Sequence, residues 1–374
     1  MKTHHINPLF VIITLITLFS LTISHLQAQD PNRVGFGGIG SVGDHYTARE
    51  AIFINPARIA AGAKAYGQVS YSFYRIPFSF LEDADIQSRV VNGGYAWDSG
   101  HAIGVASSGF GLNQLSTSPK PNLRKGAIAV GYRYRSKKAL SFGLALKYGS
   151  EIRPDQKFPD QIVDGEFVPG DVGDITLRGL TVGLGMHKSW ISRQEASGFN
   201  QFELGASLAD LGGRQLVRLN DDPLGTGRYP GSMLRLGFSY KRHIAFSDER
   251  TFINVIVAYE ASKDLTPFYE FGEIPASTFL GAIFDSFTDE SLWNELGGID
   301  HAFGLRAHGN YHDFGFGLSA GIVPSVSLIN YYGAEFSYKN LAIRGAWVDY
   351  QGFANIPGYR TPSFALDWHI PIKH

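Results

Sequence analysis

The stretch from Gly126 to Gly149, GAIAVGYRYRSKKALSFGLALKYG, decides the fold. From Leu140 onward every second residue is apolar or aromatic, and the residues between them are small or positively charged. The arm before it, from Ile128 to Arg135, alternates in the same way, and only Ser-Lys-Lys-Ala separates the two arms. Two extended arms joined by a tight polar turn predict an antiparallel hairpin.

A hairpin with one apolar and one polar face fits two architectures. In a soluble sandwich the apolar face packs inward and the polar face meets water. In an outer-membrane barrel the apolar face meets lipid and the polar face lines the lumen. The hairpin alone leaves both possible, so the choice depends on the rest of the chain.

Composition narrows the function classes. The 374 residues include 44 glycines and 13% aromatic but only 18% charged residues, which favours an all-β protein with many turns. The net charge of −1 argues against a strongly basic nucleic-acid binder. Because the chain has no cysteine, it has no disulfide framework, thiolate nucleophile or cysteine-ligated metal.

The N-terminal region is predicted to hold two segments. Residues 1–29 read as a cleaved secretory signal peptide with an apolar core over 9–23, which is short for a membrane span; an uncleaved anchor is the alternative. Residues 30–65 are predicted to form a plug. Their GxGxxG match at 35–40 lacks the strand and helix that a dinucleotide site needs. Residues 46–63 look helical, with a break at Asn55-Pro56.

Residues 66–374 are predicted to form a transmembrane, antiparallel, up-and-down β-barrel of about fourteen strands. A short helix before the first strand fits a plug or periplasmic lid, or simply a helix packed on any β domain. The expected strands lie near residues 66–76, 89–99, 101–111, 126–136, 140–152, 175–190, 200–212, 233–246, 251–265, 299–310, 311–323, 330–340, 341–352 and 363–373.

Connection lengths favour the membrane barrel over the sandwich. Short turns are expected at 98–100, 136–139, 247–250, 308–312 and 339–340, and long connections at 77–88, 112–125, 153–174, 213–232, 266–298 and 351–362. With both termini in the periplasm, the short turns fall on the periplasmic side and nearly all long loops outside, as in outer-membrane barrels. A soluble sandwich gives no reason for this sorting.

Three motifs suggest chemistry but have simpler explanations. The GxSxG match at 317–321 lies inside an alternating strand, whereas a nucleophile elbow needs a sharp strand-to-helix turn. His308 and His312, with Asp313 beside them, flank an expected tight turn and read as a polar hairpin tip rather than a metal site. The acidic residues over 155–174 and at 221–222 lack calcium-loop spacing. No catalytic residue, metal site or cofactor is expected.

The connection at 266–298 is the most distinctive loop. Its segment SFTDESLWNEL predicts a short helix that begins behind Thr288 or Asp289. Long external loops of barrels carry recognition surfaces, but such a loop can equally fold as a lid into its own barrel mouth. Its position and length leave the two alternatives open.

The sequence resembles the PorV family, the outer-membrane barrels of the type IX secretion system, within the wider FadL-like superfamily. The resemblance rests on Asn55-Pro56-Ala57, FELGASLADLGG at 202–213, LRLGFSY at 234–240, IFDSFTDESLWNEL at 283–296 and GLR at 304–306. Ile54 stands where the family usually has an aromatic residue, so a diverged paralogue is an alternative.

The resemblance implies a function in protein secretion across the outer membrane of a Gram-negative bacterium. The barrel receives cargo with C-terminal signal domains from a large translocon barrel and passes it to a surface attachment protease complex. Asn55, Pro56 and Ala57 then belong to the plug. A hypothesis for the partner and cargo surface places it on the 266–298 loop, at Ser286, Phe287, Thr288, Asp289, Glu290, Trp293 and Glu295.

Two other functions are alternatives for a barrel in outer-membrane lipid. A FadL-like transporter carries hydrophobic small molecules past the plug and needs an apolar pocket that is continuous with the lumen. A lipid-modifying enzyme needs a serine, a histidine and an acid on one strand face near the membrane rim, and the sequence offers no such set.

Overall fold

The computed structural model describes most of the chain after the first fifty residues. The described ranges are 51–76, 84–114, 123–157, 161–163, 166–168, 172–195, 197–212, 215–219, 222–228, 232–246, 250–265, 299–324, 328–351 and 359–371. The expected signal peptide, the GxGxxG match and the whole 266–298 loop lie outside them.

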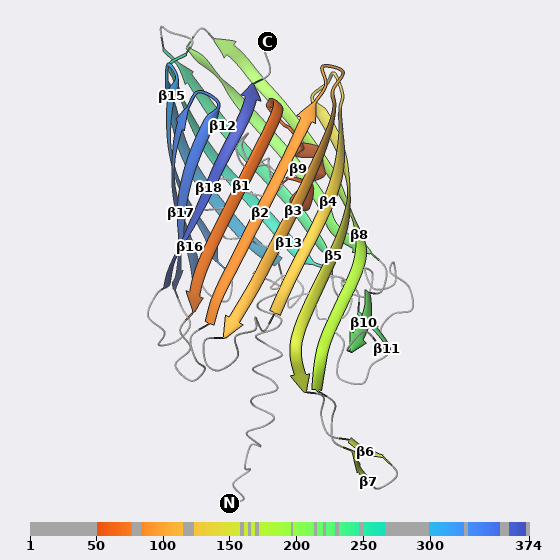
Figure 1. Ribbon diagram of the computed structural model, residues 1–374. Coiled ribbons are helices and arrows are strands. Elements are labelled where there is room, and N and C mark those ends of the chain that lie inside the picture. Colours follow the sequence, from red (N-terminus) through yellow and green to blue (C-terminus); the bar gives the residue numbers. More distant parts are fainter. Residues whose placement is uncertain are drawn as a thin grey trace, which may run out of the picture.

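Fourteen antiparallel strands close into a barrel (Figure 1). In chain order they are β1 (Ala63–Ile76), β2 (Ala84–Ala96), β3 (His101–Gln114), β4 (Leu123–Arg135), β5 (Leu140–Lys157), β8 (Val172–Glu195), β9 (Gly198–Gly212), β12 (Met233–Ala245), β13 (Phe252–Asp264), β14 (Ile299–Tyr311), β15 (Phe314–Pro324), β16 (Leu328–Tyr338), β17 (Leu341–Gln351) and β18 (Tyr359–Pro371). Each strand pairs with the next, and β18 pairs with β1. The prediction of fourteen strands is confirmed.

The apolar side chains of the barrel point outward. On β5, Leu144 and Leu146 are 49% and 50% exposed, whereas Ala145 between them is fully buried and Lys147 is 4% exposed. The same alternation recurs around the wall, so an apolar belt surrounds an inner face of small and polar residues. Lipid on the outside explains why so many large apolar side chains lack protein neighbours.

Aromatic side chains gather in this belt near the strand ends, as in Tyr134, Trp190, Tyr338 and Trp368, each exposed by more than two fifths. Such amphipathic rings favour the boundary between lipid and water. The predicted transmembrane barrel is therefore confirmed. Within the described ranges, no helix is long and apolar enough to cross a membrane.

The two ends of the barrel differ. At the short-turn end, β1 begins beside the end of β18, and turns of a few residues join β2 to β3, β4 to β5 and β16 to β17. The longer connections join the strands at the opposite, long-loop end, which is the lower end of the barrel in Figure 1.

Two of the predicted long connections contain strands. β5 and β8 run on beyond their neighbours at the long-loop end, so part of the region at 153–174 is sheet rather than loop. β6 (Gln161–Val163) and β7 (Glu166–Val168) form a separate hairpin there. β10 (Gln215–Leu219) pairs with β8, and β11 (Asp222–Arg228) pairs with β10.

The expected turn at 308–312 is misplaced by a few residues. β14 continues to Tyr311, which pairs with Phe314, so the turn consists of His312 and Asp313. His308 lies within the strand, with its side chain buried on the inner face, while His312 is exposed at the turn. The two histidines therefore do not form a shared hairpin tip.

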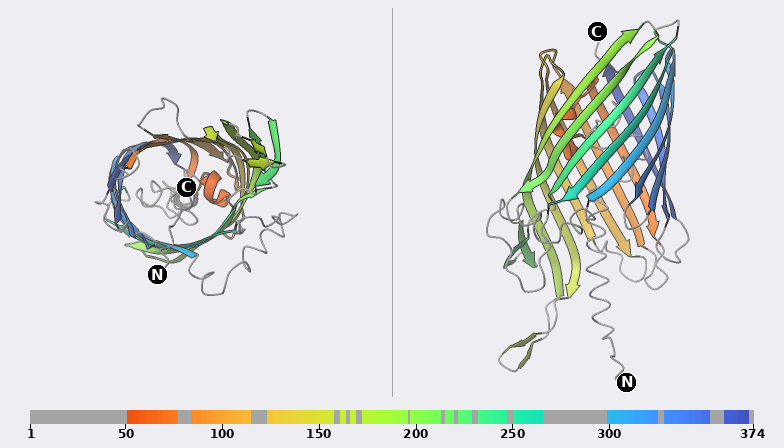
Figure 2. Two further views of the ribbon diagram at one scale, coloured as in Figure 1. Left: turned by 90° about the horizontal axis from the view of Figure 1, so that it is seen from below. Right: turned by 180° about the vertical axis from the view of Figure 1, so that it is seen from behind.

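A short N-terminal segment lies inside the barrel, against its wall. It consists of the helix α3 (Ala51–Ile54), Asn55 and the 3₁₀ turn η2 (Pro56–Arg58), and we call residues 51–60 the plug. Seen along the barrel axis, it occupies one side of the ring (Figure 2). The expected helix break at Asn55-Pro56 is confirmed, but the helical part ends at Arg58 rather than at residue 63.

Candidate functional site

The plug has a conformation that its sequence explains locally. Asn55 caps η2, because its Oδ1 accepts a hydrogen bond from the Ala57 backbone N at 3.2 Å. Pro56 takes the first position of the turn, where a missing N–H removes no hydrogen bond. Ala60 has φ 51° and Gly62 has φ 77°, so the chain turns sharply into β1 after Arg58.

The wall beneath the plug consists of glycine and alanine. A Cβ on Gly143 would lie 2.1 Å from the Ala57 backbone N, and one on Gly185 would lie 2.1 Å from Asn55 Oδ1. A Cβ on Gly131 would lie 2.4 Å from Ile59 Cδ1. Real Cβ atoms do not approach other heavy atoms this closely, so the plug fits only because these wall residues are glycine. We call this surface the plug seat: Ala102, Gly104, Ala129, Gly131, Gly143, Ala145 and Gly185.

Apolar contacts hold the plug to its seat. Ile52 and Ile59 are fully buried and belong to one cluster with Ala102, Ala129 and Ala145. Burial of one such side chain contributes about 1.5–3 kcal/mol, so the two isoleucines supply a substantial part of the docking free energy.

An ion pair joins Arg58 of the plug to Glu203 on β9, the strand next to the plug seat. Arg58 Nη1 donates to Glu203 Oε2 at 3.0 Å and lies 2.7 Å from His187 Nε2. Glu203 Oε1 also accepts from Gln201 Nε2 at 2.7 Å, and Ser239 Oγ lies 3.4 Å from Oε2. Arg58 is 2% exposed and Glu203 9%, so a charge that loses its partner here remains buried and uncompensated.

Two further polar contacts fix the start of the plug. Asn55 Nδ2 donates to the Met186 carbonyl oxygen at 3.2 Å, which joins the plug to β8. Lys147 Nζ donates to the Phe53 carbonyl oxygen at 2.9 Å and lies 5.7 Å from the centre of the Phe53 ring. Polar contacts therefore tie the plug to β5, β8 and β9, and apolar contacts tie it to β3, β4 and β5.

A bulge in β9 supplies the partner of Lys147. Between Leu208 and Leu211 the strand has one residue more than its β8 partner, and Asp210 within it has φ 58°. The bulge turns the Asp210 carboxylate inward, where Oδ1 accepts from Lys147 Nζ and from Thr181 Oγ1, each at 3.1 Å. Regular alternation would have pointed this carboxylate toward lipid.

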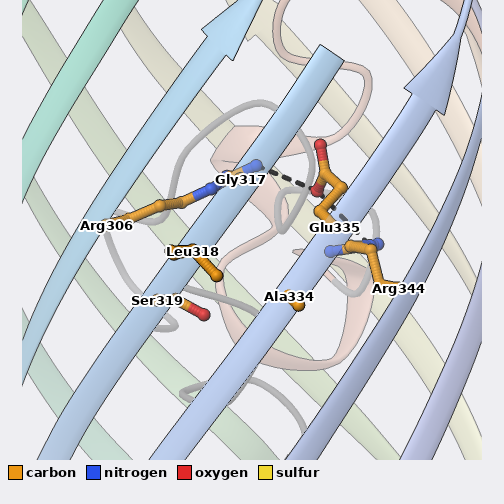
Figure 3. A pocket seen from close by; sticks show the side chains of 7 residues that line it. All are labelled: Arg306, Gly317, Leu318, Ser319, Ala334, Glu335 and Arg344. Carbon is orange, nitrogen blue, oxygen red and sulfur yellow. Dashed lines mark hydrogen bonds and ion pairs between the residues drawn. The ribbon is translucent and has the colours of Figure 1, made fainter. Parts of the chain in front are cut away.

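The wall across from the plug is charged. Arg306 donates to Glu335 at 2.9 Å, Arg344 pairs with Asp367, and His308 Nδ1 lies 3.4 Å from Glu335 Oε1. All five side chains are buried. Figure 3 shows Arg306, Glu335 and Arg344 around a small cavity, on the strands β14, β16 and β17.

The GxSxG match lies within this wall. Ser319 lines the small cavity and sits in the middle of β15, paired with Arg306 and Gly333, so no strand-to-helix turn presents its hydroxyl. The expectation that this match lies inside a strand, and not at a nucleophile elbow, is confirmed. Among the described residues, no group of three or more His, Asp or Glu side chains is placed to hold a metal ion.

The structure brings together some predicted residues and adds others. Asn55, Pro56 and Ala57 lie in the segment inside the barrel, and their role as a plug stays a prediction. The predicted docking residues from Ser286 to Glu295 lie outside the described ranges, so their role stays a prediction. Sequence reasoning missed Glu203, His187 and Asp210; a buried-face carboxylate in an otherwise small-residue strand was the available signal for Glu203.

The closed wall, the lipid-facing belt and the inserted N-terminal segment define a plugged fourteen-stranded barrel of the outer-membrane type. No protein-family model matches the sequence, and no curated protein matches it either. Among solved structures, the chain is similar to the Ralstonia pickettii toluene transporter TbuX, with a TM-score of 0.50 and 13% identity over 90% of this chain and 98% of that one.

Two further solved structures match with lower TM-scores. The CymD monoaromatic hydrocarbon channel gives a TM-score of 0.45 at 10% identity, over 91% of this chain and 97% of that one. The P. putida toluene transporter TodX gives 0.43 at 10% identity, over 91% and 100%. The likeness to TbuX concerns the fold alone. It agrees with the barrel fold that the sequence predicts, while FadL-like and PorV membership stay predictions.

Proposed function

We propose that this protein is an outer-membrane channel through which hydrophobic small molecules pass along the plug seat when the plug moves. The observation that carries this proposal is the chemistry of the wall under the plug. The plug seat on β3, β4 and β5 consists of glycine and alanine, with Arg133, Ser141 and Lys147 at its borders on the same inward faces, whereas β14, β16 and β17 carry paired charges. A plug that leaves its seat therefore uncovers an apolar strip that is bordered by polar side chains.

An apolar strip suits a hydrophobic solute because the solute keeps contact with apolar surface while it leaves the lipid or the outer medium. The toluene transporter TbuX has the fold most relevant to this proposal, although that likeness does not extend to a shared substrate. The sequence had pointed first to protein secretion, with transport of hydrophobic molecules as the alternative. The plug seat favours the alternative.

The proposal requires that the plug moves, and a reversible lock tests this. The double variant Ile59→Cys/Gly131→Cys places two thiols where Ile59 Cδ1 and a Gly131 Cβ would lie only 2.4 Å apart. The native chain has no cysteine, so this pair is the only one that can form. We expect uptake of a hydrophobic tracer such as radiolabelled toluene into proteoliposomes to fall at least tenfold on oxidation and to recover on reduction.

The single variants Ile59→Cys and Gly131→Cys are the matched controls, since neither can close a disulfide. Their uptake should not respond to oxidant. Equal uptake by the oxidised and reduced double variant, with the crosslink confirmed by mass spectrometry, contradicts passage along the plug seat.

We keep type IX secretion as a second candidate because of the strands beyond the barrel at the long-loop end. There β5 and β8 extend beyond the other strands, and β10 and β11 continue the sheet from β8 (Figure 1). The β6–β7 hairpin forms a separate two-stranded sheet at the same end. A surface of this kind suits a protein partner better than a small solute.

Affinity purification from detergent-solubilised outer membranes separates the two candidates. Recovery of a very large barrel, of an attachment protease complex and of proteins with a shared C-terminal signal domain supports secretion. Recovery of this barrel alone leaves transport as the better account.

A further inference from the structure

Three arginines stand out on the lipid-facing surface near the long-loop end. Arg89 on β2, Arg124 on β4 and Arg178 on β8 are exposed, and the alternation of each strand points them outward. The next described side chains on the same faces toward the barrel middle are apolar: Val91 is 49%, Ile128 60% and Leu180 55% exposed. The arginines therefore lie at the outer border of the apolar belt.

The strand register joins these arginines into one patch. A continuous row of paired residues runs through Arg89, Gly109, Gly126, Ser150 and Arg178. The row crosses five neighbouring strands, so its two arginines are separated by four strand spacings, or roughly 19 Å. Arg124 lies two residues from Gly126 on the long-loop side, midway between them. We call Arg89, Arg124 and Arg178 the cationic patch.

Between Arg89 and Arg124 the outer surface is the backbone of Gly109, Gly111 and Gly126, and Ser150 lies between Gly126 and Arg178. A Cβ on Gly126 would have only the Ser108 carbonyl oxygen nearby, at 3.6 Å, and one on Gly111 would meet nothing within 4 Å. Arg89 lies across Gly109, with Nε 2.9 Å from the position of a Cβ there. A bulky headgroup can thus approach the sheet between the guanidinium groups.

Among the described residues, no carboxylate pairs with an arginine of the cationic patch. Lys125, the inward-facing neighbour of Arg124, pairs with Glu151 at 3.0 Å. In the part of the chain that the structure describes, none of the three arginines makes such a pair. Three unpaired positive charges on a chain of net charge −1 are a local feature, and guanidinium groups bind phosphate through two parallel hydrogen bonds.

We propose that the cationic patch binds the bisphosphorylated disaccharide headgroup of lipid A, with the acyl chains lying on the apolar belt below it. The row spans roughly 19 Å, so two phosphates on one disaccharide can each contact one end of it, whereas a single phosphate contacts both ends only when both arginine side chains lie flat along the sheet. The long-loop end faces the outer leaflet in barrels of this type, and that leaflet is where such a lipid is found. The headgroup then lies over the glycines of β3 and β4. Arg124 is on its long-loop side, and Arg89 and Arg178 are at the two ends of the row.

Binding to purified protein in neutral detergent tests this. The triple variant Arg89→Gln/Arg124→Gln/Arg178→Gln is compared with Arg135→Gln/Lys137→Gln/Lys138→Gln, which removes the same charge from exposed residues at the short-turn end. The probes are bisphosphorylated lipid A, its dephosphorylated form and phosphatidylglycerol. Heat-dependent gel mobility reports whether each barrel is folded.

We expect the patch variant to lose at least tenfold in affinity for bisphosphorylated lipid A and the short-turn variant to bind as the wild type does. Removal of the phosphates should weaken wild-type binding as much as the patch variant does. Two results overturn the proposal: unchanged lipid A binding by the folded patch variant, or wild-type binding of phosphatidylglycerol as tight as that of lipid A.

Discussion

Arg58 Nη1 of the plug lies 3.0 Å from Glu203 Oε2 on β9, and this ion pair joins residues that are 145 positions apart in the sequence. Through this contact the barrel wall holds the plug by charge. Arg58 and Glu203 are both buried, so the cost of desolvating them offsets much of their attraction. Removal of one partner nevertheless destabilises the docked plug, because the other charge stays buried.

Glu203→Gln should therefore loosen the plug while the barrel still closes. Loss of one partner of a buried pair costs about 3–5 kcal/mol, and here that penalty falls on the docked state of the plug. We expect a higher open probability in planar-bilayer conductance recordings. The matched control is Glu335→Gln, which breaks a buried pair on the opposite wall; conductance as high in this control would contradict a specific role for Glu203.

Gly143→Ala should displace the plug through steric conflict. A Cβ at this position would lie 2.1 Å from the Ala57 backbone N, and the backbone of η2 cannot yield without leaving the seat. We expect faster modification of a cysteine placed at Ala60 by a thiol reagent. Gly149→Ala on the same face of β5 is the control, because its Cβ meets only the Gly126 carbonyl oxygen at 3.8 Å. Equal reactivity in both variants would exclude the proposed close fit.

The loss of stability on substituting Asp210 should depend on its backbone conformation as well as on its charge. Asn tolerates its φ of 58° and can still accept from Thr181, whereas Ala meets strain and leaves Lys147 without its carboxylate. We expect Asp210→Asn to lower the free energy of unfolding in urea by about 1 kcal/mol and Asp210→Ala by about 2–3 kcal/mol. The reverse order would show that the bulge does not position this carboxylate.

Arginine substitutions on the outer face of β5 should depend on depth in the membrane. Leu144→Arg places a charge near the middle of the belt, where the cost is about 2–4 kcal/mol, and Tyr148→Arg places one near its edge, where the cost is about 0–1 kcal/mol. Reversible unfolding from lipid vesicles measures both. Similar losses for the two variants would argue against the orientation of the belt described above.

The alternation of apolar residues made the strands predictable, because each lipid-facing position needs an apolar side chain whatever lies elsewhere in the chain. Asn55-Pro56 predicted the break in the plug for an equally local reason, since proline cannot continue a helix. The seat was not predictable in this way. It depends on which glycines meet the plug, and the register between the plug and β5, β8 and β9 leaves no periodic signal.

Asp210 shows a second limit of sequence reasoning. Alternation within ADLGG assigns its side chain to lipid, and only the extra residue in β9 turns it toward Lys147. His308 shows a third, because the turn after β14 lies later than the polar residues suggested, and the histidine joins the charged wall instead of a loop. In both cases a shift of register by one or a few residues decides the environment.

The most direct test of the central claim, passage along the plug seat, uses a photoreactive alkyl diazirine as the hydrophobic solute. Ala145 faces the plug and Leu144 faces lipid, so labelling of these two neighbours on β5 separates the lumen from the membrane. We predict that excess unlabelled solute suppresses labelling of Ala145 and leaves Leu144 unaffected, and that the oxidised Ile59→Cys/Gly131→Cys variant loses the Ala145 label. Labelling of Leu144 alone, in every state of the plug, would contradict the account.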